Sequence, residues 1–183
     1  MSRISLRRIV KTTPTAIVLA LPALLVGIAL AAPDKYTLSV PNGLAFSEFR
    51  GYETWEDVAV SQTEKGIKAI VANPAMMDAF RSGLPGDGKL FPDGSKVAKI
   101  EWIFKRNTVS PYFVNVPDTL KSVSFIEKDV KRFPNTHGWA YAQFTYDPAT
   151  DTFAPSVEGA ECGYACHTIV AAKDYIFTAY PKR

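Results

Sequence analysis

The sequence predicts an α+β fold: a single domain rich in antiparallel β-sheet, with a few short helices. Three observations support this prediction. Short segments in which apolar and polar residues alternate follow one another through most of the chain, which is typical of strands with one buried face. Pro, Gly, Asp and Asn separate these segments at short intervals, as they do between consecutive antiparallel strands. Residues 73–83 instead have the start and stop signals of a helix.

The segments before this helix predict an extended entry, one packed turn and two strands. Residues 33–41 are expected to be extended. Residues 49–55 contain three aromatic side chains at a spacing of three, so we expect a short helix or turn that packs on the core. The β-branched content of residues 58–63 and 66–71 predicts two strands.

The helix is defined at both ends by residue type. Asn73 is the predicted N-cap, Pro74 occupies the first helical position, and Gly83 can adopt the left-handed conformation that ends a helix. Met76 and Met77 lie on its apolar face. Methionine can be an axial haem ligand, but on such a face we expect the two residues to fill the core.

Four further strands are expected after the helix, each bounded by turn residues. They span residues 96–104, 122–128, 138–146 and, at the C-terminal end, 174–180. The segments between them are expected to form loops, an irregular connection and turns: residues 84–94, 106–119, 129–133 and 147–151.

Residues 1–31 predict a cleaved signal peptide, which leaves residues 32–183 as the domain. Four basic residues precede an apolar segment at 15–31 that ends in Ala-Leu-Ala, a small-x-small cleavage site. The alternative is a retained membrane anchor, although the segment is short and contains Pro22. Cleavage would remove four positive charges and change the formal net charge from +3 to −1. The mature chain therefore has no charge excess that favours nucleic acid or anionic lipid.

Both cysteines and one of the two histidines lie within residues 161–167, Glu-Cys-Gly-Tyr-Ala-Cys-His. Attachment of a c-type haem normally uses Cys-x-x-Cys-His, in which two thiols bond the porphyrin and the histidine binds iron. Cys162, Cys166 and His167 have one extra residue between the cysteines. A helix accommodates this spacing, because positions four apart share a face about as well as positions three apart.

Three other interpretations of these residues stay open from the motif alone. An exported protein with an even number of cysteines usually forms a disulfide, here Cys162–Cys166. A zinc site would use both thiols and His167, but zinc needs about four ligands and a fourth is not evident. Two buried free thiols are the third possibility. An export signal followed by a Cys-His motif favours haem, and together they predict a periplasmic protein.

Three longer stretches resemble the cytochrome P460 family. They are Phe-Pro-Asp-Gly-Ser-Lys-Val-Ala-Lys-Ile-Glu-Trp at 91–102, His-Gly-Trp-Ala-Tyr at 137–141, and Cys-His-Thr-Ile-Val-Ala-Ala-Lys-Asp-Tyr-Ile-Phe-Thr at 166–178. The resemblance extends from residue 50 to the C-terminus. It implies a periplasmic, homodimeric, β-rich protein with one covalent haem c, His167 as the proximal iron ligand and an open distal side.

The resemblance implies one of two functions. The first is an oxidoreductase that oxidises hydroxylamine or a similar small nitrogen compound and passes electrons to a periplasmic acceptor. In that group a lysine forms an additional bond to the haem. The second function, that of the related cytochrome c′-beta group, is binding of a diatomic gas such as nitric oxide, or electron transfer without turnover.

The resemblance also nominates further site residues. Lys99 matches the position of the cross-linking lysine, with Lys96 as the alternative on the other face of the same predicted strand. A plain strand lysine paired with Glu101 is the competing interpretation of Lys99. Glu158 is the implied proton acceptor. It and Glu161 could instead be solvated carboxylates at a helix N-terminus. His137 is a possible sixth ligand or base, but its position in a turn before glycine favours the surface.

Overall fold

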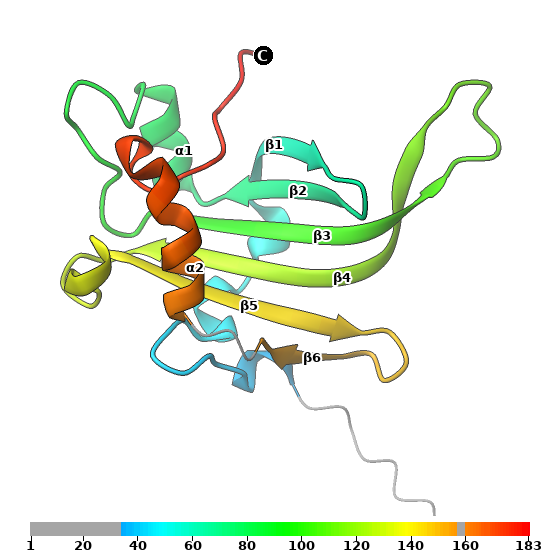
Figure 1. Cartoon of the computed structure of the whole chain (residues 1–183), viewed down its shortest axis with the longest axis horizontal. Coiled ribbons are helices and arrows are strands. Elements are labelled where there is room, and N and C mark those ends of the chain that lie inside the picture. Colours follow the sequence, from blue (N-terminus) through cyan, green and yellow to red (C-terminus); the bar gives the residue numbers. More distant parts are fainter. Residues whose placement is uncertain (1–33, 157–159) are drawn as a thin grey trace, which may run out of the picture. The chain divides into compact units, whose positions relative to one another are not determined.

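A computed structural model of the chain describes residues 34–156 and 160–183. Its centre is a six-stranded antiparallel sheet whose strands follow their order in the sequence (Figure 1). The strands are β1 (Glu56–Gln62), β2 (Ile67–Ala72), β3 (Lys96–Arg106), β4 (Asn115–Lys128), β5 (Trp139–Asp147) and β6 (Thr152–Pro155). The α+β prediction is confirmed.

Two α-helices accompany the sheet: α1 (Pro74–Arg81) between β2 and β3, and α2 (Ala160–His167) after β6. The cap of α1 is as predicted. The Asn73 side chain accepts a hydrogen bond from the Met76 backbone N–H at 3.1 Å, Pro74 follows, and Gly83 lies at φ 85° after the last turn. Within the described residues, no helix is both long and apolar enough to cross a membrane.

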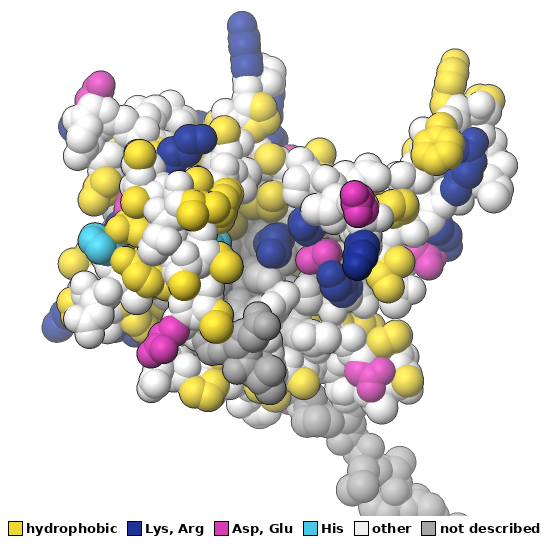
Figure 2. Space-filling view, in the orientation of Figure 1, with side chains coloured by type: hydrophobic (Ala, Val, Ile, Leu, Met, Phe, Trp, Pro, Cys, Tyr) yellow, Lys and Arg dark blue, Asp and Glu magenta, His cyan; other side chains and the backbone are white. Residues whose placement is uncertain are grey.

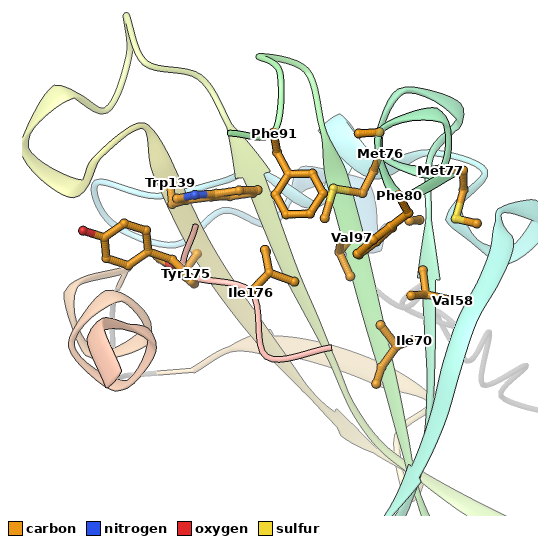
Figure 3. Close-up of a cluster of buried hydrophobic side chains, with 13 residues drawn as sticks. Val58, Ile70, Met76, Met77, Phe80, Phe91, Val97, Trp139, Tyr175 and Ile176 are labelled. Atoms are coloured by element: carbon orange, nitrogen blue, oxygen red, sulfur yellow. The ribbon is translucent and has the colours of Figure 1, made fainter. Parts of the chain in front are cut away.

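One core lies on the face of the sheet that α1 and α2 cover. Figure 3 shows Met76, Met77 and Phe80 of α1 packed toward Val97 of β3 and Phe91 before it. Both methionines are fully buried, so they fill the core as expected. Other members of this cluster come from β2, β5 and the segment after α2: Ile70, Ala72, Trp139, Tyr141, Tyr175 and Ile176.

A second core lies on the opposite face. Three short 3₁₀ helices cover that face: η1 (Lys35–Thr37), η2 (Phe46–Phe49) and η3 (Tyr52–Thr54). Phe46 and Phe49 are fully buried against Phe125 of β4, with the Phe49 and Phe125 rings stacked at 4.2 Å between centroids. Because successive side chains of a strand point to opposite faces, each central strand contributes to both cores.

The structure differs from the sequence-based expectations at four places. Residues 33–41 were expected to be extended, but Lys35–Thr37 form the 3₁₀ helix η1, because the Asp34 side chain accepts from the Tyr36 backbone N–H and caps the turn. Residues 174–180 were expected to be a strand, but this prediction is wrong: the segment has no strand and lies against the sheet face, where Ile176 is buried. The expected irregular connection at 106–119 is largely the hairpin that joins the long strands β3 and β4. The short strand β6 was not expected, and it pairs with the end of β5.

Candidate functional site

The two cysteines lie on α2, four residues apart and therefore on the same side of the helix. Both thiols are free and exposed, so the structure contains no Cys162–Cys166 disulfide. Both also line a cavity of about 240 Å³ between α2 and the sheet. Two thiols side by side at one cavity are placed to react with a single molecule inside it.

Gly163 lets α2 approach the sheet closely. A Cβ atom built on this glycine would lie 2.5 Å from the Cβ and 2.7 Å from the Cγ of Tyr141 on β5. Any side chain larger than hydrogen would therefore force the helix and the strand apart. Sequence reasoning missed this role. The available signal was the position of the glycine between two cysteines that share one side of a helix. Glycine inside a helix lowers stability, so its presence there indicates a close contact that a larger side chain would prevent.

His167, the last residue of α2, has one ring nitrogen engaged in a hydrogen bond, and within the described residues the other nitrogen has no partner. Its Nδ1 lies 2.6 Å from the backbone carbonyl oxygen of Tyr175. A carbonyl can only accept, so Nδ1 carries the proton and Nε2 retains its lone pair. Tyr141 and Phe177 pack on the ring, each with its centroid 4.8 Å away. The result is an oriented imidazole with a free metal-binding nitrogen, the usual arrangement of a histidine ligand.

The charge state of His167 also suits a ligand. Burial lowers the pKa of His167, the hydrogen bond to the Tyr175 carbonyl raises it, and the nearby charge of Lys99 lowers it, with a net decrease. The lowered pKa favours neutral imidazole, which is the form that binds metals.

Lys99 of β3 is half-buried and points to the α2 face of the sheet, where it lines the same cavity as Cys162, Cys166 and His167. Within the described part of the chain, its ammonium group has no hydrogen bond or ion pair. Glu101 is not its partner, because the Glu101 carboxylate pairs with Lys121 at 3.0 Å. The structure therefore does not support the interpretation of Lys99 as an ion-paired strand lysine.

The pKa of Lys99 is lowered. Burial is the largest cause, the negative charge of Glu101 opposes it, and the positive charges of Lys68 and Lys121 lower the pKa further. A lysine of this kind releases its proton more readily and becomes a nucleophile. Figure 2 shows basic and acidic side chains gathered over the strands beside α2.

Lys96, the alternative to Lys99, lies on the other face of the sheet. Its ammonium group donates to the backbone carbonyl of Glu48 at 2.9 Å and pairs with the Glu127 carboxylate at 3.3 Å. It also lies 4.9 Å from the centroid of the Phe49 ring. Lys96 is therefore separated from the cysteines by the sheet, and Lys99 is the lysine that the fold brings to them.

A larger cavity, of about 490 Å³, shares part of its wall with the first. Lys99, Ser124, Ile126 and His167 line both cavities. The rest of the larger wall is mostly apolar and comes from β1, β2, α1, β3 and the segment after α2; it includes Val58, Val60, Ile70, Phe80, Ile176 and Phe177. A ligand that contacts His167 and Lys99 can therefore extend into both cavities, which together have the size and apolar lining of a cofactor site.

The other candidate residues lie away from these cavities or outside the described residues. His137 is exposed at φ 55°, with its Nδ1 2.7 Å from the Tyr164 hydroxyl, and it lines neither cavity. Glu161 is exposed in the first turn of α2. Glu158 lies outside the described residues. The fold thus brings together Lys99, Cys162, Cys166 and His167.

The arrangement fits a haem better than a metal ion held by side chains alone. In residues 34–156 and 160–183, no group of three or more His, Cys, Asp or Glu side chains is placed to hold a metal ion. A haem needs only one imidazole for its iron and two thiols near its edge. The free Nε2 of His167 and the free thiols of Cys162 and Cys166 meet both needs.

Comparison with protein-family models gives a match to Cytochrome P460 over residues 49–178. The matched region runs from the end of η2 to beyond α2, so it includes the whole sheet and all four residues at the cavities. A search of curated proteins finds no match.

Proposed function

Because the chain belongs to the cytochrome P460 family, which implies a haem cofactor, we propose that it is a c-type haem protein that oxidises hydroxylamine or a similar small nitrogen compound. The observation that carries the proposal is the grouping of two free thiols, a neutral imidazole with an available Nε2, and a lysine that has no ion pair within the described residues. These groups surround two cavities that share four lining residues. Cys162 and Cys166 would hold the haem, and His167 would bind its iron.

Attachment requires only addition chemistry. Cys162 and Cys166 would each add across one vinyl group of the haem: the sulfur would bond one carbon, the thiol hydrogen would move to the other, and no oxidant would be consumed. Because Cys162 and Cys166 are exposed on one side of α2, both sulfur atoms are accessible for this reaction. The haem supplies the redox centre, while the chain holds and orients it.

Lys99 is the residue that we assign to the additional bond. With the haem bound, the Lys99 nitrogen would replace one N–H by a bond to a porphyrin carbon that loses one C–H. The two protons and two electrons released would pass to an oxidant such as a peroxide. Only a neutral amine can attack, and the burial and absent ion pairing of Lys99 favour that form. Such a bond would distort the ring and alter the iron, one of the few ways in which a protein tunes a haem.

Turnover also needs acceptors for protons and electrons. Removal of two electrons and two protons from hydroxylamine gives nitroxyl, so a base must lie near the substrate. We propose Glu158 for this role, on the family resemblance. The electrons would pass to a periplasmic acceptor, and the predicted signal peptide at residues 1–31 supports that location.

Binding of a gas such as nitric oxide without turnover is the second candidate function. The apolar wall of the larger cavity favours it, because Val58, Ile70 and Phe177 offer no hydrogen bond to a polar substrate. The two functions differ in the bond from Lys99, which only the oxidoreductase requires.

An optical spectrum of the haem-loaded protein, with an assay of hydroxylamine oxidation, distinguishes the two functions. We expect wild type to have a red-shifted absorption band that Lys99→Met removes, with oxidation falling about 10- to 100-fold. Lys96→Met is the matched control, because it removes a lysine from the same strand on the other face of the sheet. An ordinary haem spectrum and no oxidation in wild type would instead establish the gas-binding function.

A further inference from the structure

The carbonyl that orients His167 belongs to an unusual turn. Asp174 and Tyr175 are consecutive residues with positive φ, 48° and 63°, and neither is glycine. Side chains disfavour this conformation, so it persists only where the surroundings enforce it. The turn points the Tyr175 carbonyl toward His167, whose Nδ1 lies 2.6 Å from its oxygen. The forces that hold the turn therefore also set this hydrogen bond.

Asp174 anchors the turn through three contacts from distant parts of the chain. Its Oδ1 accepts from the Lys128 ammonium group at 2.7 Å and from the Trp139 indole N–H at 3.0 Å. Its Oδ2 accepts from the backbone N–H of Phe91 at 2.9 Å. These donors come from the end of β4, the start of β5 and the loop before β3. Figure 3 shows Trp139 and Phe91 beside Tyr175 and Ile176 in the core.

The Lys128–Asp174 pair is almost completely buried, with side-chain exposures of 2% and 1%. Burying two charges is costly, and well-packed apolar residues of similar size often stabilise a protein as well or better. What a charged, hydrogen-bonded pair adds is a defined direction and distance. Lys128 also lies 4.8 Å from the centroid of the Trp139 ring, so its position is restricted as well.

We propose that the buried Lys128–Asp174 pair is a positioning device for His167: it fixes the Tyr175 carbonyl and thereby sets how strongly the imidazole donates to the haem iron. The inference rests on the proposed function, because it takes His167 as the iron ligand. A firm hydrogen bond from Nδ1–H makes the other nitrogen more basic, and a more basic ligand stabilises the oxidised iron. Lys128 and Asp174 act through Tyr175 and His167, so they are positioning residues.

Asp174→Asn tests the proposal in the haem-loaded protein. The asparagine keeps the size of the side chain, but it loses the charge that attracts Lys128, and only one of its two polar atoms can accept. We expect the iron–histidine stretching frequency of the reduced protein, measured by resonance Raman spectroscopy, to fall. We also expect the equilibrium constant for reduction to rise about tenfold, which corresponds to about 59 mV in reduction potential.

Glu127→Gln is the control, because it weakens another partly buried ion pair, Lys96–Glu127, on the opposite face of the sheet. It should leave both readouts at their wild-type values. Trp139→Phe provides a second variant that removes one hydrogen bond to Asp174 and keeps both charges. It should shift the iron–histidine frequency and the reduction potential in the same direction as Asp174→Asn, by a smaller amount. If Asp174→Asn does not fold, Trp139→Phe alone tests the proposal.

Two results would overturn the proposal, and they are distinguishable. If the folded variants retain the wild-type frequency and potential, the pair is structural only and His167 can still be the ligand. If wild type shows no iron–histidine vibration, His167 is not the ligand and the proposed function fails together with the inference. A shift of equal size in Glu127→Gln would also refute a specific role for the Lys128–Asp174 pair.

Discussion

Replacing Gly163 with alanine tests how closely α2 must approach the sheet. The added Cβ would lie 2.5 Å from the Cβ of Tyr141, whereas ordinary contact begins at 3.4 Å. The helix and β5 must therefore separate by about 1 Å, because the closest atom, the Cβ of Tyr141, is fixed by the backbone and cannot rotate away. Overpacking of this kind costs about 1–3 kcal/mol, and the better helix propensity of alanine recovers about 1 kcal/mol. We expect a net destabilisation of about 0–2 kcal/mol.

The larger effect of this change should be on the site. A displacement of about 1 Å is enough to disrupt groups that must act together, and Cys162 and Cys166 flank Gly163 on the displaced helix. We expect haem staining of the protein on a denaturing gel, relative to total protein, to fall severalfold, with a decrease in the melting temperature of a few degrees.

Ala165→Ser is the matched control for Gly163→Ala. It adds one heavy atom to the same helix at an exposed position, so haem staining and melting temperature should stay at wild-type values. The reasoning would be refuted if Gly163→Ala bound haem as wild type does and melted at the same temperature or higher. That result would mean that α2 does not need its close contact with Tyr141.

Two further predictions concern the framework of the domain. Asn73→Ala should lower the free energy of unfolding, measured with urea, by about 2–3 kcal/mol, because the side chain accepts from the Met76 and Lys96 N–H groups and donates to the Gly94 carbonyl. Asn73→Ser, which keeps the cap, should lose less, and an equal loss would contradict this explanation. Burial raises the pKa of Glu48. Hydrogen bonds from Arg132 and from the Ala45 N–H lower it, and so do the positive charges of Arg132 and Lys96. These effects outweigh burial, so the pKa of Glu48 in the folded state lies below its ordinary value of 4.5. The unfolded state then binds more protons at Glu48 than the folded state does. The charged Glu48 side chain therefore stabilises the fold above about pH 4.5, and this contribution disappears as the pH falls through the pKa of Glu48 in the folded state. Glu48→Gln should therefore be less stable by about 1 kcal/mol at pH 7 and equal to wild type once the pH lies below the pKa of Glu48 in the folded state. A difference that did not depend on pH would show that the charge of Glu48 contributes nothing.

Local signals in the sequence were sufficient to predict most of the sheet and the first helix. The strand at 96–104 alternates, with Val97 and Lys99 on one face and Ala98 and Ile100 on the other, and the structure has β3 there. The cap at Asn73 and the glycine at 83 placed α1 to within two residues at each end. Such features depend only on neighbouring residues, so the sequence displays them directly.

The features that the sequence did not reveal depend on residues far apart in the chain. Residues 174–180 have the composition of a strand, but the Asp174 carboxylate is held by Lys128, Trp139 and Phe91, and this contact turns the segment across the sheet face. Strand pairing would require the segment to reach a free sheet edge. A sequence pattern contains no information about a partner 46 or 83 residues away.

The residues of the candidate site also fall into those that the sequence predicts and those that only the structure reveals. The motif alone indicated Cys162, Cys166 and His167, because their chemistry lies in their spacing. The family resemblance nominated Lys99, and the face on which it lies became evident only from the structure. The Tyr175 carbonyl as the partner of Nδ1 was not predictable, because any backbone oxygen can accept and only the turn at Asp174 selects this one.

The sequential order of the strands has a consequence for how the protein folds. Each strand pairs with its neighbour in the chain, from β1 to β6, so every hairpin can close without waiting for residues that come later. The sheet can therefore form before α2 packs on it. A chain that folds in this order already has the sheet wall of the smaller cavity in place when Cys162 and Cys166 pack against it.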